Sequence, residues 1–532
     1  MKKYLLWAVA ALAAGCSQDD AAPAPAEPVA PQEPVAPRSI VFTCDETELS
    51  ANGAASVALR VDPADAQIVP TDFRLVDEQT GACPDDFTFY PTGETDPEAG
   101  TYGMRLIYKG GERKFRRSFR AVYGSGDDAL RSGTLLVSAA SYMPVVHVRT
   151  EAPVTDKENW IAGTLRIDGG NRFEDFAQTA VSVRGRGNST WAWEKKPYAL
   201  KFDKKQSVLG MPKHKRWCLI ANYMDRTHMR NRVAYYIGQH SKLAYTVRNR
   251  YAELYFNDQY YGFYLLTEQI KVDKNRVDIP ELEAADNAGD ALTGGYLLEF
   301  DNNYDEVRKF RTTGTDIPVN IKSPDAEEMT DEQFAYIRKY VNDADAAVAA
   351  LRKGGSTAEP FKYIDRESMI DFWICFEVMA NHEILHPKSI YFHKDRGGKL
   401  VAGPIWDFDY QTLIEGTKTQ WIDYNLSYQY NEFPWYENNW WNILLMYDAS
   451  FRADVKKRWQ EWYPFLKTVP DFMEQERKAI ATAVAHDNQR WTISGTGNPN
   501  GDEWLSFEMA VARLKSVYST RLEWMNSQIA KW

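Results

Sequence analysis

The chain has 532 residues, of which 44% are hydrophobic, 26% charged and 13% aromatic. This length exceeds one ordinary domain, so we expect two or three, each with a sizeable core. The formal net charge of −11 argues against a nucleic-acid binder, because such proteins present an excess of Lys and Arg to the phosphates. No stretch beyond the N-terminus reaches the apolar length of a membrane span.

Residues 1–16 have the pattern of an export signal. Lys2 and Lys3 precede an apolar run to Leu12, and small residues then lead to Cys16. This order is typical of a signal peptide. A Cys directly after small residues resembles a bacterial lipoprotein signal, in which Cys16 is lipidated, and the acidic residues that follow resemble the surface-export signals of Bacteroidetes-type lipoproteins. We therefore expect a lipoprotein at the outer membrane or cell surface, held by an N-terminal lipid anchor; a cleaved secretory signal is the alternative.

Residues 17–38 and 39–142 differ in pattern. The first segment is rich in Ala, Pro and Glu, which predicts an extended tether. The second has short alternating apolar runs separated by Gly, Asp and Pro, as in an all-β immunoglobulin-like sandwich that serves as a spacer or binding module. Within it, Cys44 and Cys83 could be bridged in an oxidising compartment. The expected strands cover residues 39–42, 55–61, 103–108, 115–122 and 134–137.

Residues 143–532 mix strand and helix patterns, which predicts one α+β domain. Thr330, with Gln333 three places on, has the form of a capping box that opens a helix. Pro464 and Pro470 are expected to separate two C-terminal helices. The expected strands cover residues 145–150, 162–167, 252–256, 260–266, 296–300 and 390–393, and the expected helices 229–243, 330–351, 450–463, 471–485 and 505–529, with a further helix capped by Asp365.

Two carboxylates, Asp407 and Asp409, stand two residues apart between Trp406 and Tyr410. If this segment is extended, they point to the same face. Adjacent carboxylates repel each other unless a cation or a shared proton relieves them. Oxygen ligands without sulfur suit Mg²⁺ or Ca²⁺ rather than zinc. A metal site is therefore one interpretation, and an acidic solvated turn is the other.

A glycine-rich loop, Gly185-Arg-Gly-Asn-Ser-Thr190, follows a strand and precedes a second strand that carries Lys201. Glycines let a loop bring its amides close to a phosphate, although two-glycine turns are also common in other roles. Lys201 is expected to face away from the apolar Leu200 and Phe202. The side chains that add hydrogen-bond donors to a phosphate site here are Arg184, Arg186, Asn188 and Ser189.

Further motifs occur along the chain. They are 195–202 (KKPYALKF), 208–212 (VLGMP), 217–225 (WCLIANYMD), 229–231 (MRN), 253–257 (ELYFN), 261–270 (YGFYLLTEQI), 294–299 (GGYLLE) and 404–409 (PIWDFD). Together with the glycine-rich loop, they resemble the CotH family, the spore-coat atypical kinases, from about residue 145 to 415 of this chain. The resemblance implies a two-lobed atypical kinase-like fold and ATP-dependent protein kinase activity with Mg²⁺ (or Mn²⁺) in a cleft.

The resemblance also implies roles for individual residues. The loop at 185–190 would cover the phosphates and Lys201 would pair with them, while Asp407 would hold the metal with Asp409 beside it. Glu268 is the candidate acidic partner of Lys201, with a strand-end surface ion pair as the alternative. Trp406 is a candidate for stacking on adenine or for the core. Asp225, Arg230 and Asn231 stand at a helix start, where they form either a cap or part of the site.

The sequence departs from the family at the catalytic loop. Family members tend to have Asn-x-Asp after the long helix and a further Asn several residues on. Here Glu383 follows Asn381 where the Asp would be, and Ser389 stands near the metal-binding Asn. The extra methylene of Glu383, the candidate base, displaces its carboxylate, and a misplacement of about 1 Å can cost about a hundredfold in rate. His382 and His386 have i, i+4 spacing for a metal, but Pro387 argues against a continuing helix.

Residues 421–441 are unusually dense in Trp and Tyr. Aromatic faces interspersed with Asn and Gln suit glycan or peptide binding, and core packing is the alternative. Two functions are therefore predicted. One is an exported CotH-like phosphotransferase that moves a phosphoryl group from ATP to a protein acceptor. The other is a catalytically inactive surface protein that binds a glycan or a protein partner.

Overall fold

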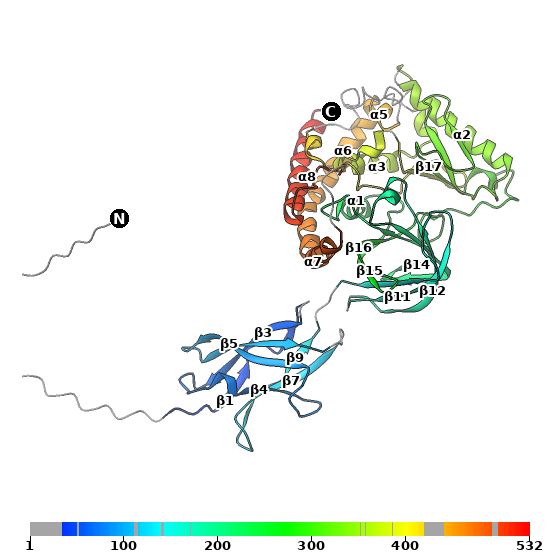
Figure 1. Ribbon diagram of the computed structural model, residues 1–532. Helices are drawn as coiled ribbons and strands as arrows, with labels where there is room; N and C mark the ends of the chain where they lie inside the picture. Colours follow the sequence, from blue (N-terminus) through cyan, green and yellow to red (C-terminus); the bar gives the residue numbers. More distant parts are fainter. Residues whose placement is uncertain are drawn as a thin grey trace, which may run out of the picture. The chain divides into compact units, whose positions relative to one another are not determined.

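The computed structural model divides the chain into two compact units, Met1–Ala140 and Ser141–Trp532 (Figure 1). The structure describes residues 34–50, 53–110, 115–139, 143–170, 172–351, 353–356, 358–385, 387–419, 441–491 and 498–532. The expected signal peptide with Cys16, most of the tether, His386 and the aromatic tract up to residue 440 lie outside these ranges. Within them, no helix is both long enough and apolar enough to cross a membrane.

The described part of the first unit consists of strands in two sheets that share one apolar core, as their alternating pattern predicts. Leu59 and Leu106 enter this core from one sheet and Phe119 and Val137 from the other. The first sheet has the order β1 (Ser39–Phe42), β3 (Ala54–Asp62), β6 (Thr101–Tyr108), β5 (Phe87–Asp96). The second has the order β2 (Glu46–Glu48), β9 (Leu135–Ser138), β7 (Arg116–Tyr123), β4 (Phe73–Asp77), with β8 (Leu130–Arg131) beside β7.

Two features of this unit differ from the sequence-based expectation. Cys44 is half-buried and Cys83 is exposed, and both are free thiols, so no disulfide joins them. Strands β2, β4, β5 and β8 were missed; the second half of β5, Pro-Thr-Gly-Glu-Thr-Asp, is polar and largely exposed, so it lacks the alternation of a half-buried strand.

In the second unit, one sheet closes on itself. Its order is β10 (Val145–Thr150), β11 (Ile161–Asp168), β12 (Phe176–Gly185), β13 (Tyr198–Val208), β14 (Met211–Ile220), β16 (Gln259–Glu268) and β15 (Asn249–Phe256), with β15 returning parallel to β10. Alternate side chains such as Leu200, Trp217 and Leu266 fill its interior. Their neighbours Ala199 and Cys218 therefore lie on the outer face of this closed sheet.

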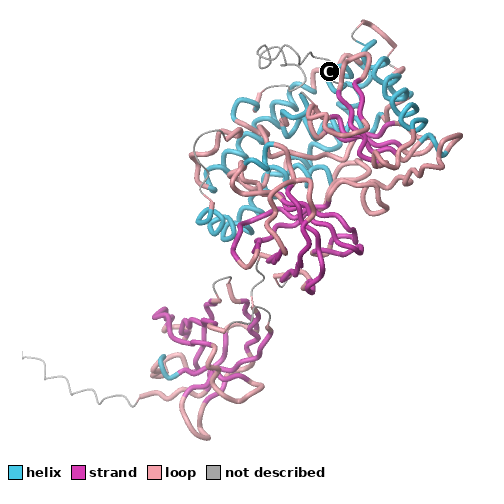
Figure 2. Tube along the Cα trace, turned by 45° about the vertical axis from the view of Figure 1, so that its right-hand side comes forward, coloured by secondary structure: helices cyan, strands magenta, loops and turns pink. Residues whose placement is uncertain are grey.

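A second, open sheet has the order β18 (Lys309–Arg311), β19 (Pro318–Ser323), β17 (Tyr296–Phe300), β20 (Ile390–Lys394), β21 (Leu400–Ala402). Figure 2 shows the two sheets of this unit as separate groups of strands with helices beside them. The longer helices are α1 (Arg230–Gln239), α2 (Asp331–Leu351), α3 (Arg366–Met379), α6 (Ala449–Leu466), α7 (Val469–Arg490) and α8 (Phe507–Ile529), with the short α5 (Trp441–Leu445) beside α2. The open sheet and these helices share one large core.

Helix starts follow the capping signals of the sequence. The amide of Gln333 donates to Thr330 Oγ1 at 3.2 Å and the amide of Thr330 donates to Gln333 Oε1 at 3.0 Å, which confirms the capping box before α2. Asp365 accepts from the amide of Ser368 at 2.8 Å and caps α3. The prediction for Pro464 was wrong, because α6 continues through it to Leu466. Pro470 instead lies in the first turn of α7, where an absent amide hydrogen costs no helical bond.

A buried ion pair ties α7 to the closed sheet. Lys195 Nζ donates to the carbonyl oxygen of Phe263 at 2.6 Å and lies 2.9 Å from Asp487 Oδ1. The same Asp487 oxygen accepts from the amide of Phe263 at 2.7 Å. Burial lowers the pKa of Lys195, and the Asp487 carboxylate opposes this shift. Burial also lowers the pKa of His228, which lies beside this pair, to about 4.

Candidate active site

A cavity of about 650 Å³ lies between the closed sheet and the open sheet. This volume falls within the range of small-molecule sites. One wall comes from the closed sheet and includes Arg184, Ala199, Cys218 and the loop at 185–190. The other wall comes from β17, β19, β20 and the segment after β21. The two regions that the sequence analysis singled out, near residues 185–190 and 403–410, therefore meet in one space.

The glycine-rich loop is built so that its backbone approaches the cavity. A side chain at Gly185 would meet the Trp191 ring at 2.6 Å and the Asp156 carbonyl oxygen at 2.7 Å. Gly187 has a φ of +83°, which other residues rarely adopt. The donor side chains that the sequence predicts for a phosphate site, Arg184, Arg186, Asn188 and Ser189, all line the cavity.

Asp407 and Asp409 also line the cavity, although the segment that carries them is not the extended strand that the sequence pattern predicted. The expectation of an extended segment was wrong. Strand β21 ends at Ala402, the following residues form no strand, and Asp407 has a φ of +66°. The two carboxylates are nevertheless hydrogen-bonded to each other. Burial and the Asp407 charge hold the pKa of Asp409 well above its ordinary value, as expected for two acids that share a proton.

Contacts from several segments hold this irregular loop in place. Asn231 Oδ1 accepts from the amide of Phe408 at 2.7 Å, and Asn381 Nδ2 donates to the Asp407 carbonyl oxygen at 2.8 Å. Asn500 Nδ2 donates to the carbonyl oxygen of Asp409 at 2.8 Å. The backbone around both carboxylates is therefore fixed by amide side chains from three distant parts of the chain.

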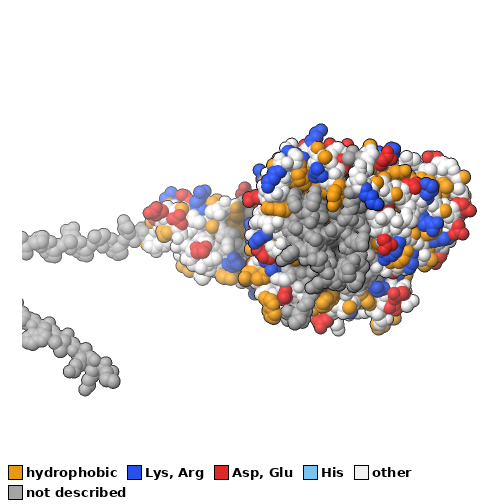
Figure 3. Space-filling model, turned by 90° about the horizontal axis from the view of Figure 1, so that it is seen from above, with side chains coloured by type: hydrophobic (Ala, Val, Ile, Leu, Met, Phe, Trp, Pro, Cys, Tyr) orange, Lys and Arg blue, Asp and Glu red, His pale blue; other side chains and the backbone are white. Residues whose placement is uncertain are grey.

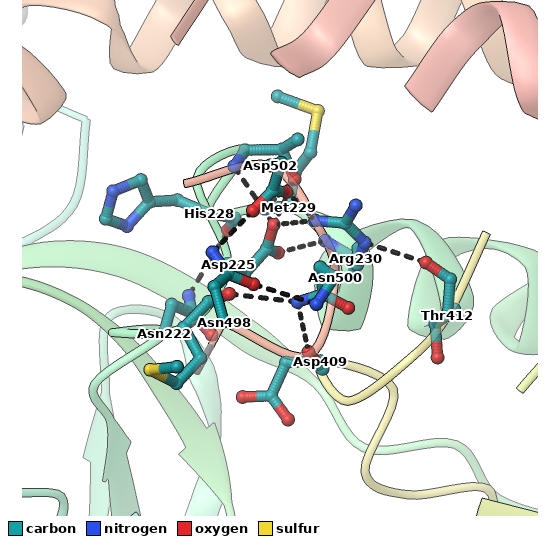
Figure 4. A network of polar contacts seen from close by, with 12 residues as sticks. Asn222, Asp225, His228, Met229, Arg230, Asp409, Thr412, Asn498, Asn500 and Asp502 are labelled. Carbon is teal, nitrogen blue, oxygen red and sulfur yellow. Dashed lines mark hydrogen bonds and ion pairs between the residues drawn. The ribbon is translucent and has the colours of Figure 1, made fainter. Parts of the chain in front are cut away.

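Behind this loop lies a buried charge network (Figure 4). Arg230 contacts the carboxylates of Asp225 and Asp502, the latter at 2.8 Å, and its Nε donates to the Thr412 carbonyl oxygen at 2.8 Å. In Figure 4 the carboxylate of Asp409 points away from the network. Asp225 also accepts from the Arg230 amide at 2.9 Å, as a helix cap would. Asp225 and Arg230 therefore position the acidic loop from behind.

The predicted pair of Lys201 with Glu268 was wrong. Glu268 stands in register with Trp217 and Leu200, whose side chains point into the closed sheet, whereas Lys201 lies on the outer face. The Glu268 carboxylate instead accepts from Tyr245 Oη at 2.8 Å and lies near two guanidinium groups, Arg248 Nε at 3.6 Å and Arg276 Nε at 3.9 Å. Neither Lys201 nor Glu268 is among the residues that line the cavity.

Other lysines line the cavity, and one of them, Lys322, pairs with carboxylates there. Lys322 of β19 lies 3.1 Å from Glu299 Oε2 of the neighbouring strand β17, and it also pairs with Glu306. Burial alone would lower the pKa of Lys322, but the charges of Glu299 and Glu306 raise it above its ordinary value. Tyr391 Oη donates to the other oxygen of Glu299. The signal in the sequence is Glu299 itself, a carboxylate inside the apolar strand Tyr-Leu-Leu-Glu-Phe.

The loop after α3 brings Glu383 and Ser389 to the cavity. Glu383 is buried in a short 3₁₀ turn, and its amide donates to Asn381 Oδ1 at 2.9 Å. Ser389 Oγ donates to Asp407 Oδ2 at 3.5 Å, and its amide donates to Asp301 Oδ2 at 2.9 Å. Burial and the nearby Glu299 charge raise the pKa of Asp301 to about 7. Of the two departures from the family motif, Ser389 thus contacts the Asp407 carboxylate, and Glu383 lines the same cavity.

Trp406 lines the cavity but is only 7% exposed. Its ring stacks on Tyr235 at 6.0 Å between centroids, and the Arg186 guanidinium lies 5.5 Å from its centroid. These contacts favour the interpretation of Trp406 as a core residue that also positions Arg186. At the C-terminal end of the aromatic tract, Trp441 is fully buried.

The acidic pair suits a cation that other groups help to hold. Within the described ranges, no group of three or more His, Cys, Asp or Glu side chains is placed to bind a metal ion. Mg²⁺ does not need such a group, because it is commonly held by one or two carboxylates together with substrate phosphates and waters. Two carboxylates held together at the cost of a raised pKa fit that role, with Asp407 and Asp409 as the ligands.

The family described as CotH kinase protein matches residues 183–525. This chain belongs to the CotH family. No curated protein matches it. Among solved structures, surface layer protein SbsC, domains 1–6, is 10% identical over 35% of this chain and 22% of that one, with a TM-score of 0.15. A marsupial T cell receptor is 10% identical over 30% of this chain and 90% of that one, also with a TM-score of 0.15. This chain therefore spans about a fifth of the SbsC length, and neither score supports a shared fold.

The CotH match includes both walls of the cavity. It begins at Val183, one residue before Arg184, and ends within α8. It therefore covers the glycine-rich loop, Lys322, the acidic pair and the network around Arg230. The first unit and strands β10 and β11 precede it.

Proposed function

We propose that this CotH protein is an ATP-dependent phosphotransferase that acts on a protein hydroxyl. In this proposal the closed sheet and the open sheet serve as the two lobes of an atypical kinase-like fold. The observation that carries the proposal is one cavity in which a glycine-rich loop with two arginines stands opposite a carboxylate pair. A triphosphate with its metal ion needs both, because anionic oxygens bind to amide and guanidinium donors while the cation binds to carboxylates.

Each wall would bind a different part of the nucleotide. The amides of residues 185–190, with Arg186, Asn188 and Ser189, would bind phosphate oxygens. Lys201 does not line the cavity; among the lysines that do, Lys322 is the candidate for binding a phosphate, because it is held by Glu299 of the neighbouring strand. Asp407 and Asp409 would hold Mg²⁺ or Mn²⁺, which supplies charge neutralisation between the phosphates.

Glu383 is the candidate base. In the transfer, the acceptor hydroxyl oxygen forms a bond to the γ-phosphorus, the bond from that phosphorus to the bridging oxygen of ADP breaks, and the hydroxyl proton passes to the Glu383 carboxylate. Glu383 lies in the same cavity as Asp407, and Asn381 holds the backbone of both residues. Proton transfer of this kind requires a carboxylate within hydrogen-bond reach of the hydroxyl.

The test is calorimetry of the purified chain with ATP, in the presence and absence of Mg²⁺ or Mn²⁺, together with transfer of labelled phosphate. Metal-dependent ATP binding that Asp407→Ala abolishes supports the proposal. Absence of nucleotide binding under every metal condition contradicts it.

A second function is kept because Glu383 and Ser389 depart from the family motif beside the metal site. It is a catalytically inactive surface protein that binds a glycan or a protein partner. Nucleotide binding without transfer, and uptake of an oligosaccharide by the protein, would favour this alternative. Replacing Glu383 by Asp and Ser389 by Asn would then show whether the missing motif residues account for the lost transfer.

We also propose that the protein is exported and lipid-anchored at Cys16, with the first unit acting as an immunoglobulin-like spacer between membrane and CotH domain. The basis is the residue pattern at the N-terminus and the two sheets of the first unit. Metabolic labelling with a radioactive fatty acid tests it. Label that is incorporated into the wild type and absent from Cys16→Ser supports the anchor, and an unlabelled, freely secreted wild type contradicts it.

A further inference from the structure

The hairpin formed by β13 and β14 is strongly basic. Residues 201–216 contain six Lys or Arg and one Asp, although the whole chain has a net charge of −11. Lys204, Lys213 and Lys215 are exposed, and no ion pair involves them within the described residues. Lys205 is also exposed and pairs with Asp273. The hairpin therefore presents an excess of positive charge to solvent.

At the cavity end of the same hairpin, further cations gather around Trp160. Three cations lie over the Trp160 ring, with the charged groups of Arg184, Arg216 and Lys201 at 4.6, 4.9 and 5.9 Å from its centroid. Lys201 and Arg216 are register partners on β13 and β14. Arg184 also lines the cavity. We call Arg184, Trp160, Lys201, Arg216 and the lysines 204, 213 and 215 the basic track.

The cations of the basic track are close enough to repel one another. Burial and the charge of Arg184 lower the pKa of Arg216, and Asp325 opposes this shift. Other acidic residues near the basic track include Asp203 on the hairpin, Asp273 on Lys205, Asp156, whose carbonyl oxygen accepts from the Gly185 amide at 2.9 Å, and Glu158, whose carbonyl oxygen accepts from Arg184 at 3.5 Å. These acids do not neutralise all the cations of the basic track, so an anionic partner would reduce the repulsion between those cations.

On the face drawn in Figure 3, basic and acidic side chains are interspersed and neither sign gathers into a patch. A mixed surface of that kind does not select partners by charge, whereas a single-sign track does.

We propose that the acceptor of the phosphoryl group is an acidic polypeptide segment that lies along the basic track and enters the cavity at Arg184. Carboxylates pair with guanidinium groups in two-pronged geometry and with lysine as a point charge. A nucleic acid or a glycan is less well suited, because bases and sugars stack on open aromatic faces, whereas cations cover Trp160. The role as acceptor rests on the proposed phosphotransferase activity, but the binding surface does not.

The test uses the purified chain and a fluorescent peptide rich in Glu and Asp with a single Ser, measured by anisotropy at low ionic strength. The variant is Lys204→Glu/Lys213→Glu/Lys215→Glu, in which every substituted side chain is exposed. We expect about tenfold weaker peptide binding, from the loss of three favourable charge pairs and their replacement by repulsion. The matched control is Lys353→Glu/Lys457→Glu/Lys478→Glu, which changes the net charge equally at exposed sites away from the cavity. We expect it to weaken binding by less than about twofold.

Three results would overturn the proposal. Equal weakening in both triple variants would show that only net charge matters. If a peptide with Gln in place of Glu and Asp binds as tightly as the acidic peptide, the negative charge of the peptide does not contribute to binding. Tighter binding of a sulfated oligosaccharide or an oligonucleotide than of the acidic peptide would assign the basic track to another class of partner.

ATP calorimetry on the same proteins separates this proposal from the proposed function. We expect both triple variants to bind ATP like the wild type, because none of the substituted lysines lines the cavity. If the wild type binds the acidic peptide but no nucleotide, the phosphotransferase role fails and the binding surface stands. If ATP binds and the peptide does not, the basic track has been misassigned and the phosphotransferase role stands.

Discussion

The two walls of the cavity are built in opposite ways. The closed-sheet wall places Arg184 on a regular strand and follows it with a glycine-rich loop. The other wall places Asp407 and Asp409 on a segment without regular structure. The first needs only strand register to present donors, while the second holds two like charges together and depends on contacts from three distant segments.

The difference separates contacts that contribute to folding stability from contacts that contribute to ligand binding. On the closed sheet, strand register brings Arg184, Lys201 and Arg216 together over Trp160, and Arg184 also lines the cavity. The loop that carries the carboxylates of the other wall is held through its backbone, by three Asn side chains and by Arg230 of the buried network. Changes in that network should therefore affect stability, and changes in the walls should affect binding.

The largest expected effect comes from Arg230→Met, which removes the partner of two buried carboxylates, Asp225 and Asp502. Breaking a buried ion pair costs about 3–5 kcal/mol because the remaining charge is left uncompensated. Urea unfolding measures the loss. The control is Arg149→Met at the exposed pair with Asp258, where we expect less than about 1 kcal/mol. Equal losses in the two variants would show that the network does not support the acidic wall.

The next largest effect concerns the acidic wall itself. Asp407→Asn should weaken ATP binding in the presence of Mg²⁺ by about a hundredfold, or about 2.7 kcal/mol, because one of two candidate metal ligands loses its charge. Without metal, the variant and the wild type should bind ATP alike. Asp278→Asn, at an exposed position away from the cavity, is the control and should bind as the wild type does.

Lys322 and Lys201 are expected to differ in their contribution to ATP binding. Lys322→Met should weaken ATP binding by about thirtyfold, or about 2 kcal/mol, because a charged hydrogen bond to a phosphate is lost. Lys201→Met should change it by less than about threefold, since Lys201 does not line the cavity. The double variant Glu299→Gln/Lys322→Met avoids leaving Glu299 buried without its cation and checks that the loss is not unfolding. The reverse ranking of the two lysines would restore the original assignment of Lys201.

The smallest effect per pH unit is a pH dependence from Asp301. Its pKa of about 7 lies above the ordinary value, so the folded state holds a proton that the unfolded state releases. The stabilisation is complete below about pH 4 and is lost as the pH rises through about 7, with a slope of about −1.4 kcal/mol per pH unit. Asp301→Asn should flatten this slope in urea unfolding between those limits. Asp278→Asn should keep the wild-type slope; a slope unchanged in Asp301→Asn would contradict the assignment.

Much of the local structure could be predicted, because it depends on neighbours in sequence. The capping box at Thr330 and the cap at Asp365 are fixed within one helical turn. The alternation around Leu200 fixes which side chains enter the closed sheet. The resemblance to the family also predicted that the glycine-rich loop and the acidic pair meet, and both line one cavity.

The rest depends on contacts between distant strands, which spacing along the chain does not encode. Lys322 was missed because it meets Glu299 only through the register of β19 with β17. Glu268 was assigned to Lys201 because strand order alone does not say that the two residues stand on opposite faces of one sheet. The cluster over Trp160 likewise exists only after Arg184, Lys201 and Arg216 become neighbours across three strands.

Lys195 lies just before β13 and lines the cavity, yet its charge is neutralised by Asp487, 292 residues later in the chain. A truncation that removes the end of α7 would leave an ammonium group enclosed in an apolar space, with a carbonyl group as its remaining partner. Limited proteolysis near residue 487 should therefore disturb the glycine-rich loop from afar. Fragments meant to isolate the cavity must therefore keep this distant helix, which supplies the partner of Lys195.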